Sequence, residues 1–460
     1  MKKLNLLLLG LLLSTAMFIT SCKTEDPVPP PPPGPTDEEK AMTAFADYFA
    51  DAGNSVADPA FADKSLKPTG SLGTNLSTPP AGLQNANYKG AIDPNATTPW
   101  YEGWSAYAKI VKGENTPALT LANEVVIKDS DMLAAGNTVN WTKNNTYVLD
   151  GFVFVNDGQT LNIEAGTIIQ GKPGEGTSAS ALIVARGGKI NAEGTLTEPI
   201  VFTFEGDVGN TAPTVRGQWG GLIILGKATL NSSPGTSAIE GIPTTESRGL
   251  YGGNDDTDNS GSLKYISIRH GGTNIGADNE INGLTLGGVG SGTTFDYIEI
   301  LGNKDDGIEW FGGTAIIKHL ISAYCADDGL DYDEGFRGLN QFVIVHQDPS
   351  TGNADRGGEH DGGTDPETGT PYATPIFFNV TSVGNSGSRA ITFRDNAGGE
   401  YHNSIFVNYS KGVDIEYLKG QAQHSYKQFD DGKLKLENNV FFNIAAGTKG
   451  ENLFIVSILE

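Results

Sequence analysis

Two acidic motifs in the second half of the chain carry the side chains best suited to chemistry. They occupy residues 305–310 and 327–332, which lie 22 positions apart. In each motif an acidic pair is followed by a glycine, an aliphatic residue, a third acid and an aromatic residue. Carboxylates gathered in one place either bind a cation such as calcium or act as general acid and general base.

The 22-residue spacing predicts how these acids are arranged in space. It is too short for a propeller blade of about 40–45 residues, and it suits one coil of a parallel β-solenoid. Equivalent positions on successive coils stack about 4.8 Å apart, so we expect each acid of the first motif to lie against its counterpart in the second. The candidate metal ligands are the six acids of the two motifs: Asp305, Asp306, Glu309, Asp327, Asp328 and Asp331.

Two interpretations of this stacked acidic set remain open. Two unit charges about 5 Å apart repel by about 0.8 kcal/mol in water and by about 3 kcal/mol at an effective dielectric of 20. If the turns are exposed, the repulsion is tolerable and the acids form a solvated ladder without a metal. If the turns are partly buried, Ca²⁺ is the natural counter-ion because it takes several carboxylate oxygens as ligands.

Two further segments contain residue types found at metal sites. Asp256, Asp258 and Ser260 alternate before a glycine as at the start of a calcium loop, but Ser267 stands where such a loop has a bidentate glutamate. A polar surface loop is the alternative interpretation of that segment. Residues 355–363 combine acids, Arg356, a histidine and several glycines; they suit a metal or acid–base site or a hydrated loop between coils.

Familiar catalytic motifs are missing from the sequence. It contains no His-Glu-x-x-His, no Gly-x-Ser-x-Gly and no phosphate-binding Gly-Lys-Ser/Thr loop. Cys325 follows Tyr324 at a strand end, where a buried small residue is expected rather than a nucleophile. If the chain is an enzyme, Asp306, Asp328 and Asp331 would hold calcium or act as acid and base. The basic groups expected near them are Lys304, His319 and Arg337.

The elements that position these residues are predicted to be short strands. After residue 146, β-rich runs of four or five residues recur between Gly, Asn and Asp turns, and no amphipathic helix separates them. The 61 glycines fit a chain that turns corners with positive φ. We therefore predict an all-β parallel solenoid over residues 146–460. It is preceded by a small cap over residues 37–145, with a helix after the capping box 36–39 and an irregular, aromatic-rich remainder.

The first 36 residues are predicted to lie outside the fold. Residues 1–21 have the charged start and short apolar run of a signal peptide. Cys22 follows small residues, as in the lipobox of bacterial lipoproteins, and is the predicted lipidation site. Residues 22–36 include a run of prolines and form a stiff tether. These features predict a lipid anchor in the outer membrane with the folded body exposed at the cell surface.

The charge balance limits the classes of partner. The chain has 31 basic and 55 acidic residues, a formal charge of −24. Cleavage after residue 21 would remove Lys2 and Lys3 and make this −26. Such a surface excludes nucleic acid as a general partner, because phosphate binding needs clustered Lys and Arg.

Four segments carry a resemblance to a known family. Residues 258–265, 305–313, 324–329 and 394–399 resemble secreted and lipid-anchored bacterial proteins with a right-handed parallel β-helix. The similarity extends over roughly residues 85–460. It implies that fold and an extracytoplasmic location. It supplies no catalytic residues, because no activity is established for the family.

Two functions remain in competition at this point. The sequence favours a non-enzymatic surface module that binds an extracellular glycan, a peptide or an outer-membrane uptake complex. The alternative is a calcium-dependent polysaccharide lyase or glycoside hydrolase built on the same scaffold. Carboxylates that converge in a groove would favour the enzyme, whereas acids that only stack along the coils would favour the binding module.

Overall fold

The computed structural model describes residues 34–62, 64–276, 279–350, 352–364 and 366–460. The chain divides into two units, residues 1–36 and residues 37–460. The predicted signal peptide, the lipidation site Cys22 and most of the tether lie outside the described residues. Within the described part of the chain, no helix is long and apolar enough to cross a membrane.

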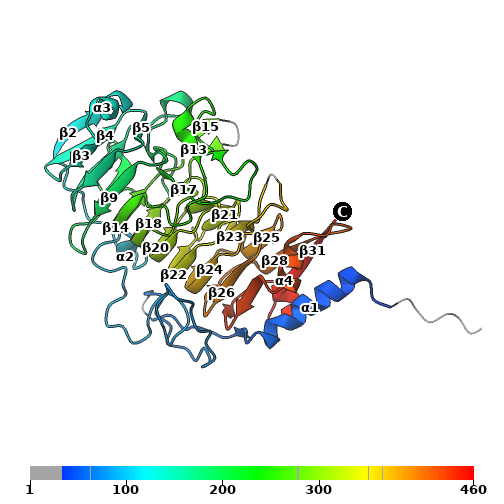
Figure 1. Ribbon diagram of the computed structural model, residues 1–460. Coiled ribbons are helices and arrows are strands. Elements are labelled where there is room, and N and C mark those ends of the chain that lie inside the picture. Colours follow the sequence, from blue (N-terminus) through cyan, green and yellow to red (C-terminus); the bar gives the residue numbers. More distant parts are fainter. Residues whose placement is uncertain (1–33, 63, 277–278, 351, 365) are drawn as a thin grey trace, which may run out of the picture. The chain divides into compact units, whose positions relative to one another are not determined.

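The second unit is a right-handed parallel β-helix, as predicted (Figure 1). One flank, here called sheet 1, is a single ladder of parallel strands, one from each coil. Along the chain its strands are β5 (Phe152–Val155), β8 (Ala181–Val184), β11 (Leu222–Leu225), β17 (Leu284–Gly287), β19 (Ile308–Phe311), β21 (Leu330–Asp333), β23 (Arg356–Asp361), β25 (Arg389–Arg394), β28 (Lys411–Leu418) and β31 (Phe454–Leu459).

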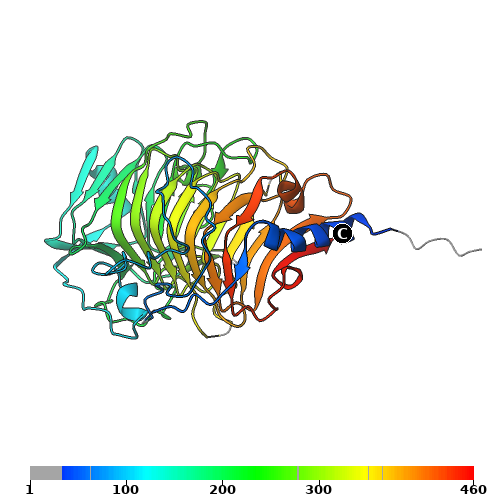
Figure 2. The same cartoon turned by 90° about the horizontal axis from the view of Figure 1, so that it is seen from below.

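The remaining strands of the coils form sheet 2, which bends to make the other two flanks (Figure 2). These strands are β1 (Ser55–Val56), β2 (Asn123–Ile127), β3 (Thr138–Trp141), β4 (Asn145–Leu149), β6 (Thr160–Ile163), β7 (Ile168–Gly171), β9 (Lys189–Glu193), β10 (Ile200–Phe204), β14 (Gly261–Arg269), β18 (Thr294–Leu301), β20 (Ile316–Ala323), β22 (Leu339–His346), β24 (Ile376–Val383), β26 (Gly399–His402), β27 (Ile405–Val407), β29 (Leu434–Glu437) and β30 (Val440–Phe442).

The minor elements lie in the segment before the first coil or in the connections between strands. Two short hairpins pair β12 (Ser237–Ala238) with β13 (Leu250–Tyr251) and β15 (Asn274–Gly276) with β16 (Asn279–Glu280). The helices are α1 (Asp37–Asp51), α2 (Tyr107–Ile110), α3 (Asp129–Ala134), α4 (Ser425–Asp430) and α5 (Gly450–Leu453), with 3₁₀ turns at Gly176–Ser178 and Ser247–Gly249.

The 22-residue repeat is the register between coils. Ile308 of β19 pairs with Leu330 of β21, and Ile298 of β18 pairs with Leu320 of β20. All four side chains are buried in the core enclosed by the two sheets. Alternate residues along each strand point inward and outward, so matching positions of successive coils stack on the same side of a sheet.

The bend of sheet 2 depends on residues with positive φ. Five long strands contain one such residue in the middle, for example Tyr297 with φ 56°. At this corner Tyr265, Tyr297, His319 and Phe342 form a stack with ring centroids 4.3–5.1 Å apart. In later coils asparagines occupy the corner: Asn379, Asn403 and Asn438. The predicted positive-φ corners are present, but aromatic rings fill four of them because stacking offsets the strained backbone.

The N-terminal part of this unit covers the solenoid in two ways. Helix α1 packs against β31 and α5 at the C-terminal coil, and β1 extends sheet 2 beside β30 (Figures 1 and 2). Residues 57–62 and 64–111 then run along the outer face of sheet 2, where Trp104 and Tyr107 pack on outward residues of the coils. Stacking begins at β2, so the predicted boundary at residue 146 falls within β4.

Candidate functional site

The outer face of sheet 1 gathers acids from successive coils. Glu309 of β19 pairs in register with Asp331 of β21, which pairs with Glu359 of β23. Their strand neighbours Ile308, Trp310, Leu330 and Tyr332 point into the core, so the three acids point outward. The 22-residue spacing predicted the first pair, and the next coil adds Glu359.

Two turn acids complete this acidic cluster. Asp306 and Asp328 lie in the turns that lead into β19 and β21. Carboxylate oxygens of Asp306, Glu309 and Asp331 lie within 4.8 Å of one another, as do those of Asp328, Asp331 and Glu359. Asp331 belongs to both triplets, so five carboxylates from three coils form one continuous group. Asp305 and Asp327 extend it, since each joins a further triplet with these turn acids.

Burial and mutual repulsion dominate the electrostatics of the acidic cluster. Asp306, Asp328, Glu309 and Glu359 are at most 8% exposed. Burial, followed by the charge of neighbouring acids, raises the pKa of Asp306, Glu309, Asp328 and Asp331 well above the ordinary range. Five close carboxylates in a poorly hydrated place cannot all stay charged without a counter-charge. The cluster must take up protons or a cation.

Basic side chains reach only one end of the cluster. Arg356 and Arg394 lie 2.9 and 2.8 Å from the Glu359 carboxylate, and Arg356 lies 3.6 Å from Asp328. At the other end, no described lysine, arginine or histidine lies within ion-pair distance of Asp306, Glu309 or Asp331. This end therefore has the stronger demand for a cation.

An asparagine supplies a further oxygen at the uncompensated end. Asn282 is 1% exposed, and its Nδ2 donates a hydrogen bond of 2.5 Å to Glu309 Oε2. Its Oδ1 is buried and has no hydrogen-bond partner, as is true of Asp331 Oδ1. Buried polar atoms are rarely left unpaired. Carboxylate and amide oxygens are the ligands that Ca²⁺ prefers, so the three carboxylates of this end, with Asn282 beside Glu309, fit the ion.

The other predicted site residues form contacts away from the acidic cluster. The Asp256 carboxylate binds Arg337 at 3.0 Å and accepts the Thr229 N–H, while Ser260 is 1% exposed. Asp258 lies 3.4 Å from Ser260 and belongs to no described group of three acids. His319 is bound to Asp296 at 2.7 Å within the aromatic stack of sheet 2. Arg337 and His319 thus serve other contacts, and Lys304 is exposed.

Two residues of the acidic cluster's surroundings, Glu359 and Asn282, were not among the metal ligands named from the sequence. Residues 355–363 were predicted to be a metal or acid–base site or a loop, and most of them form β23. The alternation of Glu359 and Asp361 with buried residues is the signal that reveals this strand. Asn282 carries no such signal, because it comes from the preceding coil and its role depends on the fold. Cys325 is buried, as predicted.

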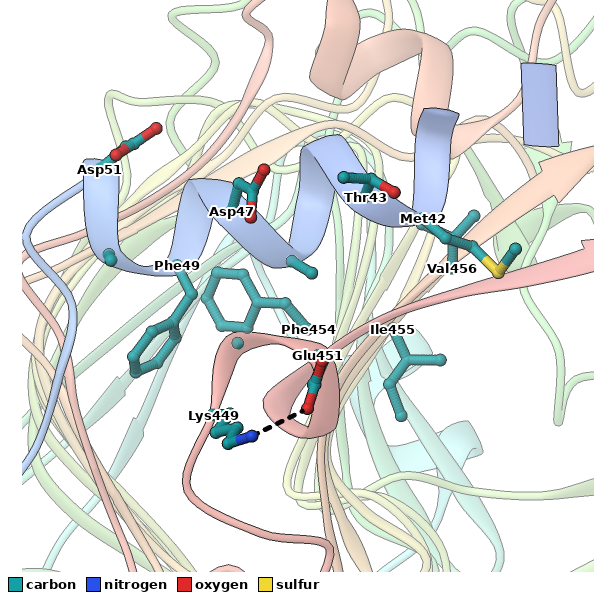
Figure 3. Close-up of a pocket in the computed structure, with 13 residues that line it drawn as sticks. Met42, Thr43, Asp47, Phe49, Asp51, Lys449, Glu451, Phe454, Ile455 and Val456 are labelled. Atoms are coloured by element: carbon teal, nitrogen blue, oxygen red, sulfur yellow. Dashed lines mark hydrogen bonds and ion pairs between the residues drawn. The ribbon is translucent and has the colours of Figure 1, made fainter. Parts of the chain in front are cut away.

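A large groove lies away from the acidic cluster. It has a volume of about 810 Å³ and is lined by α1, α5 and β31 (Figure 3). Met42, Phe49 and Val456 contribute apolar surface, and the Lys449–Glu451 ion pair at 3.4 Å lies at the edge. Asp47, Asp51 and Glu451 line the groove, but they are not among the described groups of three acids whose oxygens lie within 4.8 Å of one another. The groove is the seam where α1 packs on the last coil rather than a place for ion chemistry.

Comparisons with known proteins found two distant structural similarities and one family match. No curated protein matches the chain. Two solved structures of the surface adhesin PfbA of Streptococcus pneumoniae are similar at 12% and 11% identity. They cover 69% and 72% of this chain and 86% and 94% of the adhesin chains, with TM-scores of 0.23 and 0.16. Scores this low carry no argument about the fold or the function.

The family model for the pectate-lyase-like β-helix domain matches residues 133–457. This span includes every residue of the acidic cluster and nearly all the coils of both sheets. The chain therefore belongs to the pectate-lyase-like β-helix family.

Proposed function

We propose that the chain is a calcium-dependent binding module that meets an extracellular glycan with the outer face of sheet 1. One observation carries the proposal: Asp331 belongs to two groups of three close carboxylates. One group contains Asp306 and Glu309, and the other contains Asp328 and Glu359. A divalent ion at the first triplet would offset the repulsion of the acidic cluster. It would also present a positive charge at a face that otherwise repels anions.

The neighbouring surface supports the binding of a polar polymer. Beyond the buried acids, Asp333, Asp361, Thr392 and Arg394 are partly exposed on strands β21, β23 and β25. Arg394 binds Asp361 through two nitrogens, at 2.6 and 3.0 Å, which fixes both side chains. Hydrogen-bonding groups repeated at the strand spacing of about 4.8 Å suit a chain of sugars lying along the coils. A peptide or an outer-membrane uptake complex remains the other class of partner for this face.

The proposed location follows from the sequence. A lipid on Cys22 and the proline-rich tether of residues 22–36 would hold the β-helix at the outer membrane, exposed at the cell surface. The strongly acidic body would resist adhesion to the anionic envelope. Residues 1–33 lie outside the described ones, so the support comes from the sequence: the signal-peptide pattern, the lipobox and the run of prolines.

A second candidate function is a polysaccharide lyase or glycoside hydrolase. Burial raises the pKa of Asp333 to about 6 and that of Glu416 to about 7, so carboxyls on this face still carry protons near neutral pH. A general acid needs such a proton. Asp306, Asp328 and Asp331 would then hold calcium or act as acid and base, with Arg356, which lies 3.6 Å from Asp328, as a basic group beside them.

Calcium titration of the full chain tests the proposed function. We expect CaCl₂ to raise the melting temperature by several degrees, EDTA to reverse the change, and MgCl₂ to have a smaller effect. Asp331→Asn should abolish the calcium response, whereas the matched control Asp51→Asn, an exposed acid at the end of α1, should keep it. No calcium response in the wild-type chain would contradict the proposal.

A glycan array separates binding from catalysis. The proposal expects calcium-dependent retention of at least one polysaccharide, lost in Asp331→Asn, without new reducing ends or unsaturated products. Release of such products by the wild-type chain, lost in Asp306→Asn and Asp328→Asn, would instead establish the second candidate. If neither EDTA nor Asp331→Asn reduces polysaccharide binding, the outer face of sheet 1 is not a calcium-dependent binding surface.

A further inference from the structure

A second cavity lies on the opposite side of the coils from the acidic cluster. It has a volume of about 640 Å³ and lies between residues 102–120 and the outer face of sheet 2. Its floor consists of Ile168 of β7, Val201 of β10 and Arg269 of β14. Leu119 belongs to the opposite wall. A cavity of this size accommodates a small organic molecule.

Arg269 is the unusual residue in this cavity. It is only 5% exposed, yet its guanidinium makes few contacts with the protein. Nε donates to Ser267 Oγ at 2.7 Å and lies 4.0 Å from Glu299 Oε2. Within the described part of the chain, neither Nη atom forms a hydrogen bond or an ion pair. A buried guanidinium normally has acceptors for its N–H groups.

Glu299 does not supply those acceptors, because its carboxylate lies 4.0 Å from the Arg269 guanidinium, beyond hydrogen-bond distance, and is bound to other donors. Its oxygens accept the backbone N–H of Tyr107 at 2.7 Å and that of Ala106 at 3.2 Å, in addition to the hydroxyl of Ser267. Glu299 therefore balances the charge of Arg269 and fastens the segment that covers the sheet. The Nη side of the Arg269 fork is left for the cavity.

The other charged groups around the cavity are paired with one another. Lys143 binds Glu198 at 2.6 Å, and Lys109 binds Glu114 at 2.9 Å. Glu102 forms an ion pair with Lys112. Each of these groups thus has a close partner of opposite charge. Arg269 is the cavity's source of unused, charged donors in a fixed fork geometry.

We propose that this cavity binds a small carboxylate with an apolar body. The two carboxylate oxygens accept hydrogen bonds from Nη1 and Nη2 of Arg269, the bidentate arrangement that a guanidinium favours. The apolar part lies against Ile168, Val201 and Leu119. This site shares no residue with the acidic cluster, so it stands apart from the proposed calcium-dependent function.

The test compares an acid with its uncharged amide on the full chain at constant salt. The probes are 3-phenylpropanoate and 3-phenylpropanamide, with affinity measured by calorimetry. We expect the acid to bind at least tenfold more tightly than the amide, and Arg269→Gln to remove this preference. The control Lys64→Gln, at an exposed lysine, should change nothing.

A second variant guards against misfolding, because Arg269→Gln also leaves Glu299 without its counter-charge. Ala118 is exposed and lines the cavity, so Ala118→Phe should fill it without disturbing the core. We expect this variant to keep its melting temperature and to lose at least tenfold in affinity for the acid. Equal binding of acid and amide, no binding of the acid at 10 mM, or full affinity in Ala118→Phe would each overturn the proposal. Loss of calcium binding in Asp306→Asn leaves this result unchanged and so separates the two sites.

Discussion

The Asp306 carboxylate accepts the backbone N–H of Asp328, 22 residues later, at 2.8 Å. Asp328 repeats the relationship one coil further on, where its Oδ1 accepts the N–H of Arg356 at 2.6 Å. One oxygen of each acid thus binds the backbone of the next coil, while both acids remain within 4.8 Å of other carboxylates of the cluster. The acids cannot move apart without losing backbone hydrogen bonds, so the fold itself holds like charges together.

Asp306→Asn should stabilise the calcium-free protein. The amide oxygen can still accept the Asp328 N–H, and the substitution removes one charge from the acidic cluster. We expect the free energy of unfolding to rise by about 1–3 kcal/mol at pH 7.5 in EDTA, the scale of one relieved like-charge contact. Urea unfolding measures it, and the calcium-induced stabilisation should fall in the same variant. Lower stability in EDTA would mean that Asp306 has a favourable partner other than the Asp328 amide.

The raised pKa of Glu416, on the outer face of sheet 1, predicts that the stability of the protein depends on pH. Burial, then the charge of Asp395, raises the pKa of Glu416 to about 7 from its ordinary value of 4.5. The acidic groups that face it are Asp395, Glu367 and Asp361. The folded state holds the Glu416 proton more tightly than the unfolded state does. The contribution of this proton to the free energy of unfolding is therefore complete below pH 4.5. It declines as the pH rises to about 7.

Glu416→Gln should flatten this decline. The variant is expected to match the wild type at pH 4.5 and to melt at a higher temperature at pH 7.5, since the glutamine carries no charge at either pH. Melting curves at both pH values in EDTA give the comparison, with Glu124→Gln at an exposed position of β2 as the control. An unchanged pH dependence would show that other acids of this face control it.

The repeat made much of the fold predictable from sequence. A shift of 22 residues aligns residues 305–310 with 327–332, and that shift is the strand register of β19 and β21. Helix α1 was predictable because its apolar residues, such as Phe45, recur at helical spacing after a capping box. The packing position of α1 was not predictable from the sequence, because the contact between Phe45 and Phe454 joins residues about 400 positions apart.

The candidate site was predictable only in part for the same physical reason. Glu309 and Asp331 follow from the repeat, whereas Asn282 lies between β14 and β18, whose paired residues are 32 positions apart instead of 22. Its contact with Glu309 depends on how the connection between these strands folds. The basic residues near the acids also differ from those expected from the sequence. His319 was expected there, but it has a positive φ of 55° and lies at the bend of sheet 2.

The aromatic stack predicts an unusual order of tolerated substitutions at Tyr297. Its ring lies 4.4 Å from that of Tyr265 and 4.3 Å from that of His319, and its φ is 56°. Tyr297→Asn loses two stacking contacts, about 1–3 kcal/mol, but asparagine accepts this backbone. Tyr297→Val loses the same contacts and adds about 1–2 kcal/mol of strain from a branched side chain at positive φ. Urea unfolding of both variants checks the order, and a valine variant as stable as the asparagine variant would contradict it.

Helix α1 should act as a cap for the last coil, and Phe45 is where that role is best tested. Its side chain is 0% exposed, with ring centroids 5.0 Å from both Phe429 and Phe454. Phe45→Ala would leave a cavity between the helix and the end of the core, which typically costs about 3–5 kcal/mol. Met42 lies on the same helix but is 42% exposed, so Met42→Ala should change stability by less than about 0.5 kcal/mol. Urea unfolding measures the loss of stability in each variant. Because the two residues lie on the same helix, the difference between them reports the effect of burial. A small loss for Phe45→Ala would mean that the solenoid core ends securely at β31 and that α1 is dispensable.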